Sequence, residues 1–370
     1  MKPELNTVIQ ADCIQWLAEQ QEPFIDLAFA DPPFNIGYLY DVYEDRKAYD
    51  EYYAWTEQWM AACCGMLKET GSFWIAIGDE YAAEVRMIGR KLGLTLRNWV
   101  IWHYTFGQNT KRKFARSHAH LFYFVRDPKQ FTFNDEAVRV FSDRQREYHD
   151  KRANPRGKIP DDTWDVFPRV CGTFGEREGW HPCQMPESVL SRIVRVSSNV
   201  GDVVFDPFTG SGTTLVAAKK LSRQYIGTEI SPNYVEGATE RLERTRPIAA
   251  EPARPGRRMP EAHRRELQAV YMEASVPTDL LHAYRHLLDA FVGYFNWRLA
   301  NAGVEGEYTT EDVWGELEKM RKRVQLPRIK SHALEPARRE VRPVPAPATR
   351  RRRGVDLSKR RPTSARRLYD

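Results

Sequence analysis

Two short apolar runs in this chain each end in an acidic residue that is followed by proline. Residues 25–30 are nearly all apolar and lead into Asp31-Pro32, and Val203-Val204-Phe205 leads into Asp206-Pro207. A continuous apolar run is typical of a strand that is covered on both faces, as in parallel sheets flanked by helices. Such runs alternate with amphipathic segments along the chain, which predicts an α/β fold with a mostly parallel central sheet.

Four acidic residues are expected at one edge of that sheet. Asp12, Asp31, Asp206 and Glu229 each stand at the carboxyl end of a predicted strand. Ligands of open parallel sheets bind at this edge. Packing does not readily explain four acids arriving there from separate strands, so the pattern predicts a binding site.

The stretch Asp31-Pro32-Pro33-Phe34 forms a rigid corner after its strand. Prolines lack an N–H group and keep the backbone extended, so the corner offers carbonyl oxygens, one carboxylate and a flat apolar ring. A planar group with an NH2 suits it, because that group would stack on Phe34 and donate to Asp31 and the Pro32 carbonyl. Taken alone, the stretch is better explained as a turn whose aspartate caps a helix.

A second motif favours a binding role for this corner over a purely structural turn. Residues 206–214, Asp-Pro-Phe-Thr-Gly-Ser-Gly-Thr-Thr, form a glycine-rich turn that opens a predicted helix. In nucleoside-binding α/β halves the glycines let the backbone approach the ligand, and an acid about 20 residues later holds ribose hydroxyls. Glu229 has this spacing. The turn is not G-x-G-x-x-G, so no pyrophosphate is indicated, and by itself it is equally consistent with a structural turn.

In combination the motifs resemble the DNA amino-methyltransferases that use S-adenosylmethionine (AdoMet), in the beta arrangement where the catalytic motif precedes the cofactor motif. Asp31 to Phe34 resembles the family's D-P-P-Y, and residues 206–214 resemble its AdoMet loop. Residues 225–229 are similar to the strand that ends in the ribose-binding acid. Residues 181–186, His-Pro-Cys-Gln-Met-Pro, resemble the H-P-T-Q-K-P element, and Ala11-Asp12-Cys13 resembles the G-D-C near the cofactor adenine.

The resemblance covers residues 7–245 and implies a Rossmann-like AdoMet-dependent methyltransferase fold. The catalytic residues it implies are Asp31, Pro32, Pro33 and Phe34. The residues it implies for AdoMet binding are Asp12, Cys13, His181, Asp206, Phe208, Thr209, Gly210, Ser211, Gly212, Thr213 and Glu229. No metal site is predicted, since the five cysteines form no C-x-x-C pair.

The implied reaction moves a methyl group from AdoMet to the N6 amine of adenine in duplex DNA, by base flipping and direct in-line transfer. The D-P-P form favours adenine, since cytosine enzymes of this class more often carry S-P-P; the N4 amine of cytosine is the alternative. A non-catalytic DNA-binding homologue is a further alternative, against which the intact Asp31, Phe34, Gly210 and Glu229 argue. RNA and protein methylases usually carry N-P-P-Y after the cofactor loop, which is the opposite order.

Three departures from the family pattern stand out. Phe34 replaces tyrosine and keeps the ring, whereas Cys183 and Met185 replace threonine and lysine. Pro-Cys-Gln at residues 182–184 also matches the nucleophile motif of cytosine carbon-5 methylases. That motif follows their AdoMet loop, whereas this one precedes it, and no E-N-V partner occurs, so we interpret Cys183 as a structural substitution.

The predicted organisation has six parts. They are a catalytic half (1–126), a target-recognition region without clear periodicity (127–180), an AdoMet-binding half (181–246), a linker (247–260), a helical extension (261–327) and a basic tail (328–370). The extension carries an apolar stripe from Leu280 to Phe295. The extension is expected to dock on the body of the protein or on a second subunit; because related enzymes often form homodimers, the stripe around Leu287 is a candidate dimer surface. A restriction endonuclease that acts on the same site is a candidate partner.

The positive charge is concentrated in two places. The tail holds 14 Lys/Arg against 4 Asp/Glu, whereas the whole chain has a net charge of only +6. Lys111, Arg112, Lys113 and Arg116 form a second cluster, which is typical either of phosphate binding or of a solvated loop. No apolar run approaches the ~20 residues of a membrane span, and the first residues lack a signal-peptide pattern. A cytoplasmic, nucleoid-associated protein is expected.

The tail composition generates a prediction. Truncation after Pro327 should weaken binding to duplex DNA and flatten its dependence on salt concentration, because fewer phosphate counterions are released. The preferred target sequence should stay the same. Fluorescence anisotropy over a salt series measures both quantities, and an altered target site after truncation would contradict the prediction.

Overall fold

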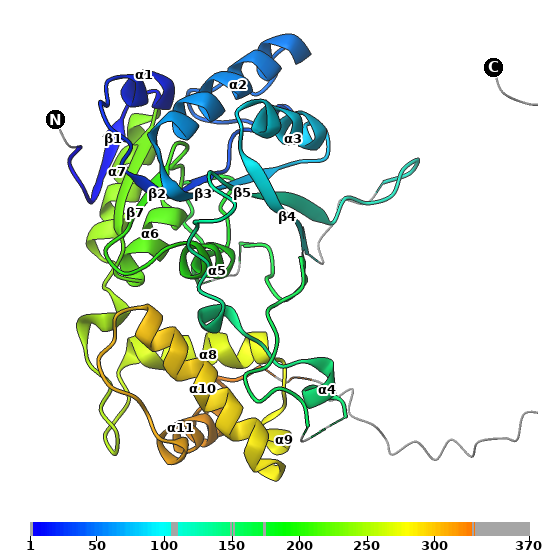
Figure 1. Cartoon of the computed structure of the whole chain (residues 1–370), viewed down its shortest axis with the longest axis vertical. Coiled ribbons are helices and arrows are strands. Elements are labelled where there is room, and N and C mark those ends of the chain that lie inside the picture. Colours follow the sequence, from blue (N-terminus) through cyan, green and yellow to red (C-terminus); the bar gives the residue numbers. More distant parts are fainter. Residues whose placement is uncertain are drawn as a thin grey trace, which may run out of the picture. The chain divides into compact units, whose positions relative to one another are not determined.

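The computed structural model describes residues 3–104, 110–148, 150, 152–172, 175–327 and 329. In these residues, eight strands form one sheet in the order β1-β8-β7-β2-β3-β5-β4-β6 (Figure 1). Their bounds are β1 Thr7–Gln10, β2 Ile25–Ala30, β3 Leu67–Ile77, β4 Thr95–His103, β5 His118–Val125, β6 Thr163–Trp164, β7 Val203–Asp206 and β8 Gln224–Glu229. Only β5 among them runs opposite to the rest. The predicted mostly parallel α/β sheet is confirmed.

Helices cover both faces of the sheet. The helices α1 (Cys13–Ala18), α2 (Tyr49–Met66) and α3 (Ala82–Lys91) lie on one face, and α5 (Glu187–Ser197) and α6 (Thr213–Lys220) lie on the other (Figure 1). In β2, Leu27 and Phe29 belong to one hydrophobic cluster, whereas Ala28 and Ala30 belong to the other. This double covering explains why the strand is a nearly continuous apolar run. The helix α7 (Pro232–Glu243) follows β8 and packs near β1.

The start of β3 differs from the sequence prediction. The helical spacing of Tyr52, Trp55, Trp59 and Met66 predicts a helix that ends near Gly71, and the apolar residues 73–77 predict a strand. In the structure β3 begins at Leu67, which pairs with Ile25 before a register shift, and regular pairing resumes at Leu27 and Ser72. Backbone pairing with β2 therefore extends the strand through polar residues that carry no strand pattern.

The predicted target-recognition region contains more regular structure than its sequence indicates. It holds η1 (Glu136–Val138), α4 (Asp143–Arg146) and β6, which pairs with β4 at the edge of the sheet. Trp164 and Phe167 are buried in the main core. A two-residue strand is stabilised by its neighbour rather than by local propensity, so periodicity alone does not find it.

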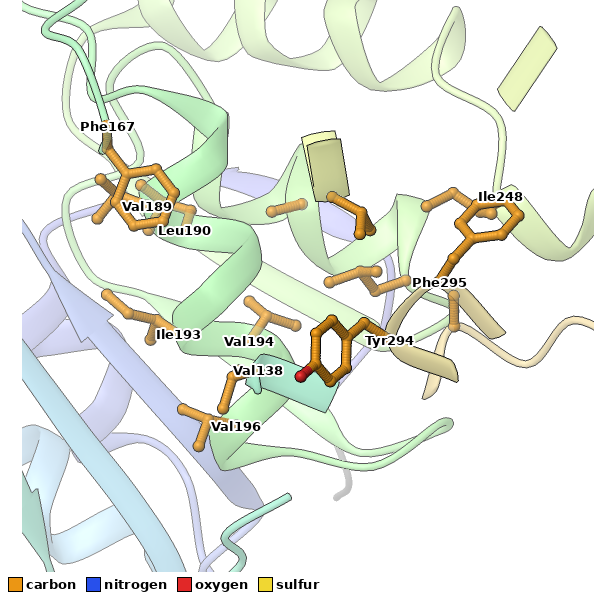
Figure 2. Packing of buried hydrophobic residues seen from close by; sticks show 14 of the residues in the cluster. Val138, Phe167, Val189, Leu190, Ile193, Val194, Val196, Ile248, Tyr294 and Phe295 are labelled. Carbon is orange, nitrogen blue, oxygen red and sulfur yellow. The ribbon is translucent and has the colours of Figure 1, made fainter. Parts of the chain in front are cut away.

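The helical extension packs on the body of the same chain. It comprises α8 (Glu261–Ala274), α9 (Thr278–Ala283), α10 (Arg285–Asn301) and α11 (Thr310–Lys322), preceded by η2 (Ile248–Ala250). Tyr294 of α10 lies beside Val138 and Val194, and Phe295 lies beside Ile248 (Figure 2). Leu287 is fully buried. Docking on the body is therefore confirmed, and the stripe around Leu287 as a dimer surface is wrong, because the stripe packs inside the protein. Of the basic tail, only residue 329 lies within the described part of the chain.

A buried ion-pair network joins the extension to α5. Glu273 of α8 lies 2.7 Å from both Arg192 and Arg298, and Glu266 lies 2.8 Å from Arg195 and 2.6 Å from Arg298. Burial by itself would raise the pKa of Glu273, but the guanidinium groups of Arg298 and Arg192 lower it to about 2.

Among the described helices, none is long and apolar enough to cross a membrane.

Replacement of Glu273 by alanine should destabilise the fold strongly. The change leaves two buried arginines short of a partner, which typically costs about 3–5 kcal/mol in the free energy of unfolding. Urea unfolding at neutral pH measures this value, with the exposed Glu318→Ala on α11 as the matched control. Since the folded pKa is depressed, the Glu273 contribution is present above the pKa of an unfolded glutamate and declines as the pH falls toward 2. Equal losses for the two variants would contradict the prediction.

Candidate active site

A cavity of about 520 Å³ lies at the carboxyl ends of the adjacent strands β1, β8, β7 and β2. The four acids that the sequence places at this edge, Asp12, Asp31, Asp206 and Glu229, all line it. They come together because these strands are parallel neighbours, so their carboxyl ends meet at one edge. Residues that are remote in sequence thus form one site.

The proline corner presents two unpaired acceptors to the cavity. Tyr52 donates its hydroxyl to the Pro33 carbonyl at 2.6 Å, which holds the corner on α2. Within the described part of the chain, no group donates a hydrogen bond to the Asp31 carboxylate or the Pro32 carbonyl. Both residues line the cavity, as does Phe34. Two acceptors and an aromatic ring are therefore free to receive an aromatic amine.

Burial makes the Asp31 carboxyl unusually basic. Desolvation raises its pKa to about 7, Asp206 contributes to the rise, and the guanidinium of Arg169 opposes it. Asp206 behaves similarly, since burial raises its pKa to about 7 despite hydrogen bonds from Thr214 and the Phe208 N–H. Near neutral pH, Asp31 is therefore poised between its two protonation states.

The glycine-rich turn is tied to the end of β8. The Gly210 N–H donates to Glu229 at 2.9 Å, and the Ser231 N–H donates to the other carboxylate oxygen at 2.9 Å. Gly210 has a φ of +47°, and a Cβ there would lie 2.8 Å from the imidazole Nε2 of His181. Gly212 does not line the cavity; its φ is +74°, and its close neighbour is Ala238 of α7. The first glycine thus shapes the cavity, and the second permits helix packing.

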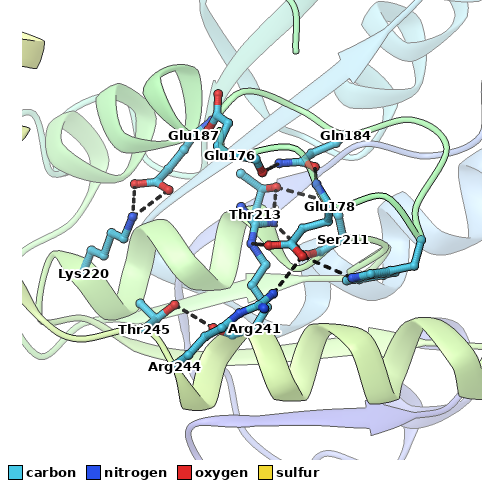
Figure 3. A network of polar contacts seen from close by, with 11 residues as sticks. Glu176, Glu178, Gln184, Glu187, Ser211, Thr213, Lys220, Arg241, Arg244 and Thr245 are labelled. Carbon is cyan, nitrogen blue, oxygen red and sulfur yellow. Dashed lines mark hydrogen bonds and ion pairs between the residues drawn. The ribbon is translucent and has the colours of Figure 1, made fainter. Parts of the chain in front are cut away.

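Arg241 of α7 also binds the glycine-rich turn (Figure 3). Its guanidinium donates to the Ser211 carbonyl and the Thr213 hydroxyl, both at 2.9 Å. Glu178 lies 3.4 Å from Arg241, and its backbone N–H donates a hydrogen bond to the Gln184 side-chain oxygen at 2.8 Å. The turn and residues 181–186 are therefore parts of one polar network.

Other predicted cofactor residues have mixed roles. Asp12 caps α1, because its Oδ1 accepts from the N–H groups of Ile14 at 2.9 Å and Gln15 at 3.1 Å. Cys13 is buried beneath it, and burial raises the pKa of its thiol. Burial lowers the pKa of His181 to about 4, so its ring is neutral at pH 7. The remaining predicted residues Phe208, Thr209, Ser211 and Thr213 line the cavity.

Cys183 also lines the cavity, but its chemistry does not suit a nucleophile. Burial raises the pKa of its thiol to about 11, so the thiol stays protonated at neutral pH. Because the thiolate is the reactive form, this argues against the alternative Pro-Cys-Gln interpretation.

The loop of residues 35–48 lines the cavity with Tyr38, Tyr40 and Tyr43. In the sequence this loop is a long, charged segment that is rich in tyrosine. Asp45 accepts from the N–H groups of Asn35 at 2.7 Å and Tyr38 at 2.8 Å, so the loop folds around this carboxylate. Asp41 accepts from Asn233 at 2.9 Å and from the Ser231 hydroxyl. The loop thereby links the proline corner to the end of β8. The lining residues that sequence analysis missed include Tyr38, Tyr40, Tyr43, Tyr104, Arg169 and Tyr234.

The predicted basic cluster is not brought together as a unit. Lys113 and Arg116 line the cavity mouth, whereas Lys111 and Arg112 are exposed and do not. Arg116 pairs with Asp79 at 2.6 Å and with Glu80. Its charge is therefore already balanced by carboxylates, which weakens the interpretation of this residue as a phosphate contact.

Comparisons with known proteins agree with this architecture. The model of a family described as DNA methylase matches residues 25–240. The chain is 34% identical over 237 residues to the type II methyltransferase M.HpaI of Haemophilus parainfluenzae, covering 64% of this chain and 74% of that protein. It is 36% identical over 248 residues to the DNA adenine methyltransferase YhdJ of Escherichia coli K12, covering 65% and 83%. The fold is similar to PvuII DNA methyltransferase (cytosine-N4-specific), with a TM-score of 0.50 and 18% identity over 64% of this chain and 89% of that one.

The elevated pKa of Asp31 predicts a gain in stability when its charge is removed. Its folded pKa of about 7 exceeds the ordinary value of 3.8, so the free energy of unfolding of the wild type falls as the pH rises between these values. Asp31→Asn should therefore be more stable than the wild type at pH 8 and nearly equal to it at pH 4. Urea unfolding at both pH values tests this, with the exposed Asp162→Asn as the control. A pH-independent difference would contradict the assignment of a desolvated, unpaired carboxylate.

Proposed function

Because this chain belongs to the N6/N4 DNA methylase family, we propose that it transfers a methyl group from AdoMet to the N6 amine of adenine in duplex DNA. The observation that carries the proposal is the pair of unpaired acceptors, the Asp31 carboxylate and the Pro32 carbonyl, beside Phe34 in a cavity. The adenine preference is supported by the D-P-P form and by the 36% identity to a DNA adenine methyltransferase. The cytosine N4 amine is the alternative.

The cavity fits AdoMet. The Glu229 carboxylate, already fixed by two backbone N–H groups, keeps lone pairs for ribose hydroxyls. In its ionised form Asp206 adds a negative charge that suits the positively charged cofactor, and Phe208 adds an aromatic wall. A side chain at position 210 would collide with His181 on the wall of the same cavity. AdoMet, when bound, supplies an electrophilic methyl group on its sulfonium.

The proline corner would act on the amine directly. An exocyclic amine is a poor nucleophile because its lone pair is conjugated with the ring. Hydrogen bonds from the amine to Asp31 and the Pro32 carbonyl favour a pyramidal nitrogen and stabilise the positive charge that develops on it. With a pKa of about 7, Asp31 also suits acceptance of the proton that the methylated amine releases.

The remaining residues would position the base. A base inside the duplex is out of reach, so it leaves the stack, and Phe34 replaces part of the stacking that is lost. The alignment of nitrogen, methyl and sulfur supplies the orientation contribution. We include in this proposal the division into a catalytic half (1–126), a target-recognition region (127–180), an AdoMet half (181–246) and a supporting extension (261–327).

The decisive experiment uses AdoMet with an isotope-labelled methyl group and duplex DNA of mixed sequence, with nucleosides identified by mass spectrometry. Label is expected on the adenine amine, and Asp31→Ala should lower transfer by at least about 100-fold, as for the loss of a transition-state hydrogen-bond partner. AdoMet binding by calorimetry should remain in the mutant. The exposed Asp162→Ala serves as the control.

Other outcomes of this experiment separate the alternatives. Label on the cytosine amine would retain the mechanism and replace the substrate base. AdoMet binding with no label in DNA would contradict the proposal and direct attention to RNA or protein. Neither binding nor transfer would favour a non-catalytic DNA-binding homologue.

A further inference from the structure

One cation in the cavity comes from the region whose sequence shows no clear periodicity. Arg169 lies in the segment that follows β6, and its side chain lines the same cavity as Asp31. More than a third of the residue is exposed. The proposed reaction, on which this inference rests, has so far assigned it no role.

The segment that carries Arg169 is firmly anchored. Trp164, Phe167 and Val170 are buried, with exposed fractions of 6%, 2% and 7%. The indole N–H of Trp102 donates to the Phe167 carbonyl at 2.8 Å. Arg192 stacks on the Phe167 ring with its guanidinium carbon 4.3 Å from the ring centroid. Buried residues on both sides of Arg169 thus hold its backbone in place at the cavity wall.

Arg169 lines the same cavity as the proline corner, and its guanidinium forms no ion pair with Asp31. It lies over the Tyr104 ring, with its central carbon 5.6 Å from the ring centroid. Burial raises the pKa of both Asp31 and Cys183, and Arg169 opposes the rise at both groups, which places its charge near each. No carboxylate of the described residues forms an ion pair with it. Apart from a hydrogen bond to the sulfur of Cys183, its N–H donors therefore remain available to a ligand.

Other cations at the cavity are less suitable. Arg116 is paired with Asp79 and Glu80, and Lys113 lies on an exposed loop. Arg169 is the positive charge that acts on Asp31 among the described residues. A guanidinium is always protonated and carries five donors in a planar fork, which suits the in-plane acceptors of a base.

An adenine in this cavity needs such a donor. Its amine would donate to Asp31 and the Pro32 carbonyl, but the ring nitrogen N1, bonded to the same carbon, is an acceptor. A buried acceptor without a partner is costly. We propose that Arg169 donates a hydrogen bond to this ring nitrogen of the flipped base. Cytosine N3 offers the same acceptor, whereas thymine N3 carries a hydrogen and would be rejected.

The test is a double-mutant cycle between protein and substrate. Once labelled transfer has located the target site, its adenine is replaced by 1-deazaadenine, in which a C–H group stands for N1. Arg169→Met keeps the aliphatic stem over Tyr104 and removes the donors. We expect the wild type to lose about 10- to 100-fold in kcat/KM on the analogue. The variant should show a similar loss on adenine and little further loss on the analogue.

Three controls keep the result specific. Arg90→Met removes an exposed positive charge on α3 and should leave kcat/KM unchanged. Urea unfolding should give similar stabilities for Arg169→Met and the wild type, because the side chain is exposed. Measurements at pH 9, above the Asp31 pKa of about 7 in the wild type, separate a contact with the base from an effect exerted through Asp31. The deficit of the variant should persist there.

Two results would overturn the inference. If Arg169→Met and the 1-deazaadenine substrate lowered kcat/KM independently of each other, Arg169 would not contact N1. Full recovery of Arg169→Met at pH 9 would show that it acts only by keeping Asp31 ionised. Both results require transfer to adenine by the wild type, so they are distinguishable from a failure of the proposed function, in which no adenine would be labelled.

Discussion

The parallel pairing of β2 with β7 is the constraint on which the site depends. Leu27 pairs with Val204 and Ala28 with Phe205, so strands that are far apart in sequence end side by side. The Val203 N–H also donates to Asp26 of β2 at 2.9 Å. Because the strands run in the same direction, the two acidic corners that follow them open into one cavity. Any slip of this pairing would separate the proline corner from the glycine-rich turn.

The same pairing has an electrostatic cost. Asp31 and Asp206 lie close enough for one to raise the pKa of the other, and burial removes the water that would solvate both. An unpaired, desolvated carboxylate such as Asp31 destabilises the folded state, but it remains available to a substrate amine. The network of Glu266 and Glu273 with three arginines shows the opposite arrangement, in which every buried charge has a partner. The protein thus has an unpaired carboxylate at the cavity, whereas the buried charges between α5 and the helical extension are paired.

The elements that surround the cavity are held from several directions. Arg241 binds the glycine-rich turn from α7, the loop of residues 35–48 joins the proline corner to the end of β8, and the segment after β6 carries Arg169 into the wall. The extension buries the outer side of α5, the helix that follows residues 181–186. Its place in the core explains why its apolar stripe is unavailable to a second copy.

The sequence by itself determined the α/β class, the two turn motifs and the acids at the edge of the sheet, because these depend on local patterns: apolar runs, prolines without N–H groups, and glycines with positive φ. It did not reveal that Asp12 caps a helix, that Arg116 is paired, or that Gly212 serves packing. The antiparallel β5, the two-residue β6 and the place of Arg169 depend on contacts between distant residues. Only the tertiary structure decided these, since strand pairing, burial and charge neighbours are set by which segments meet in space.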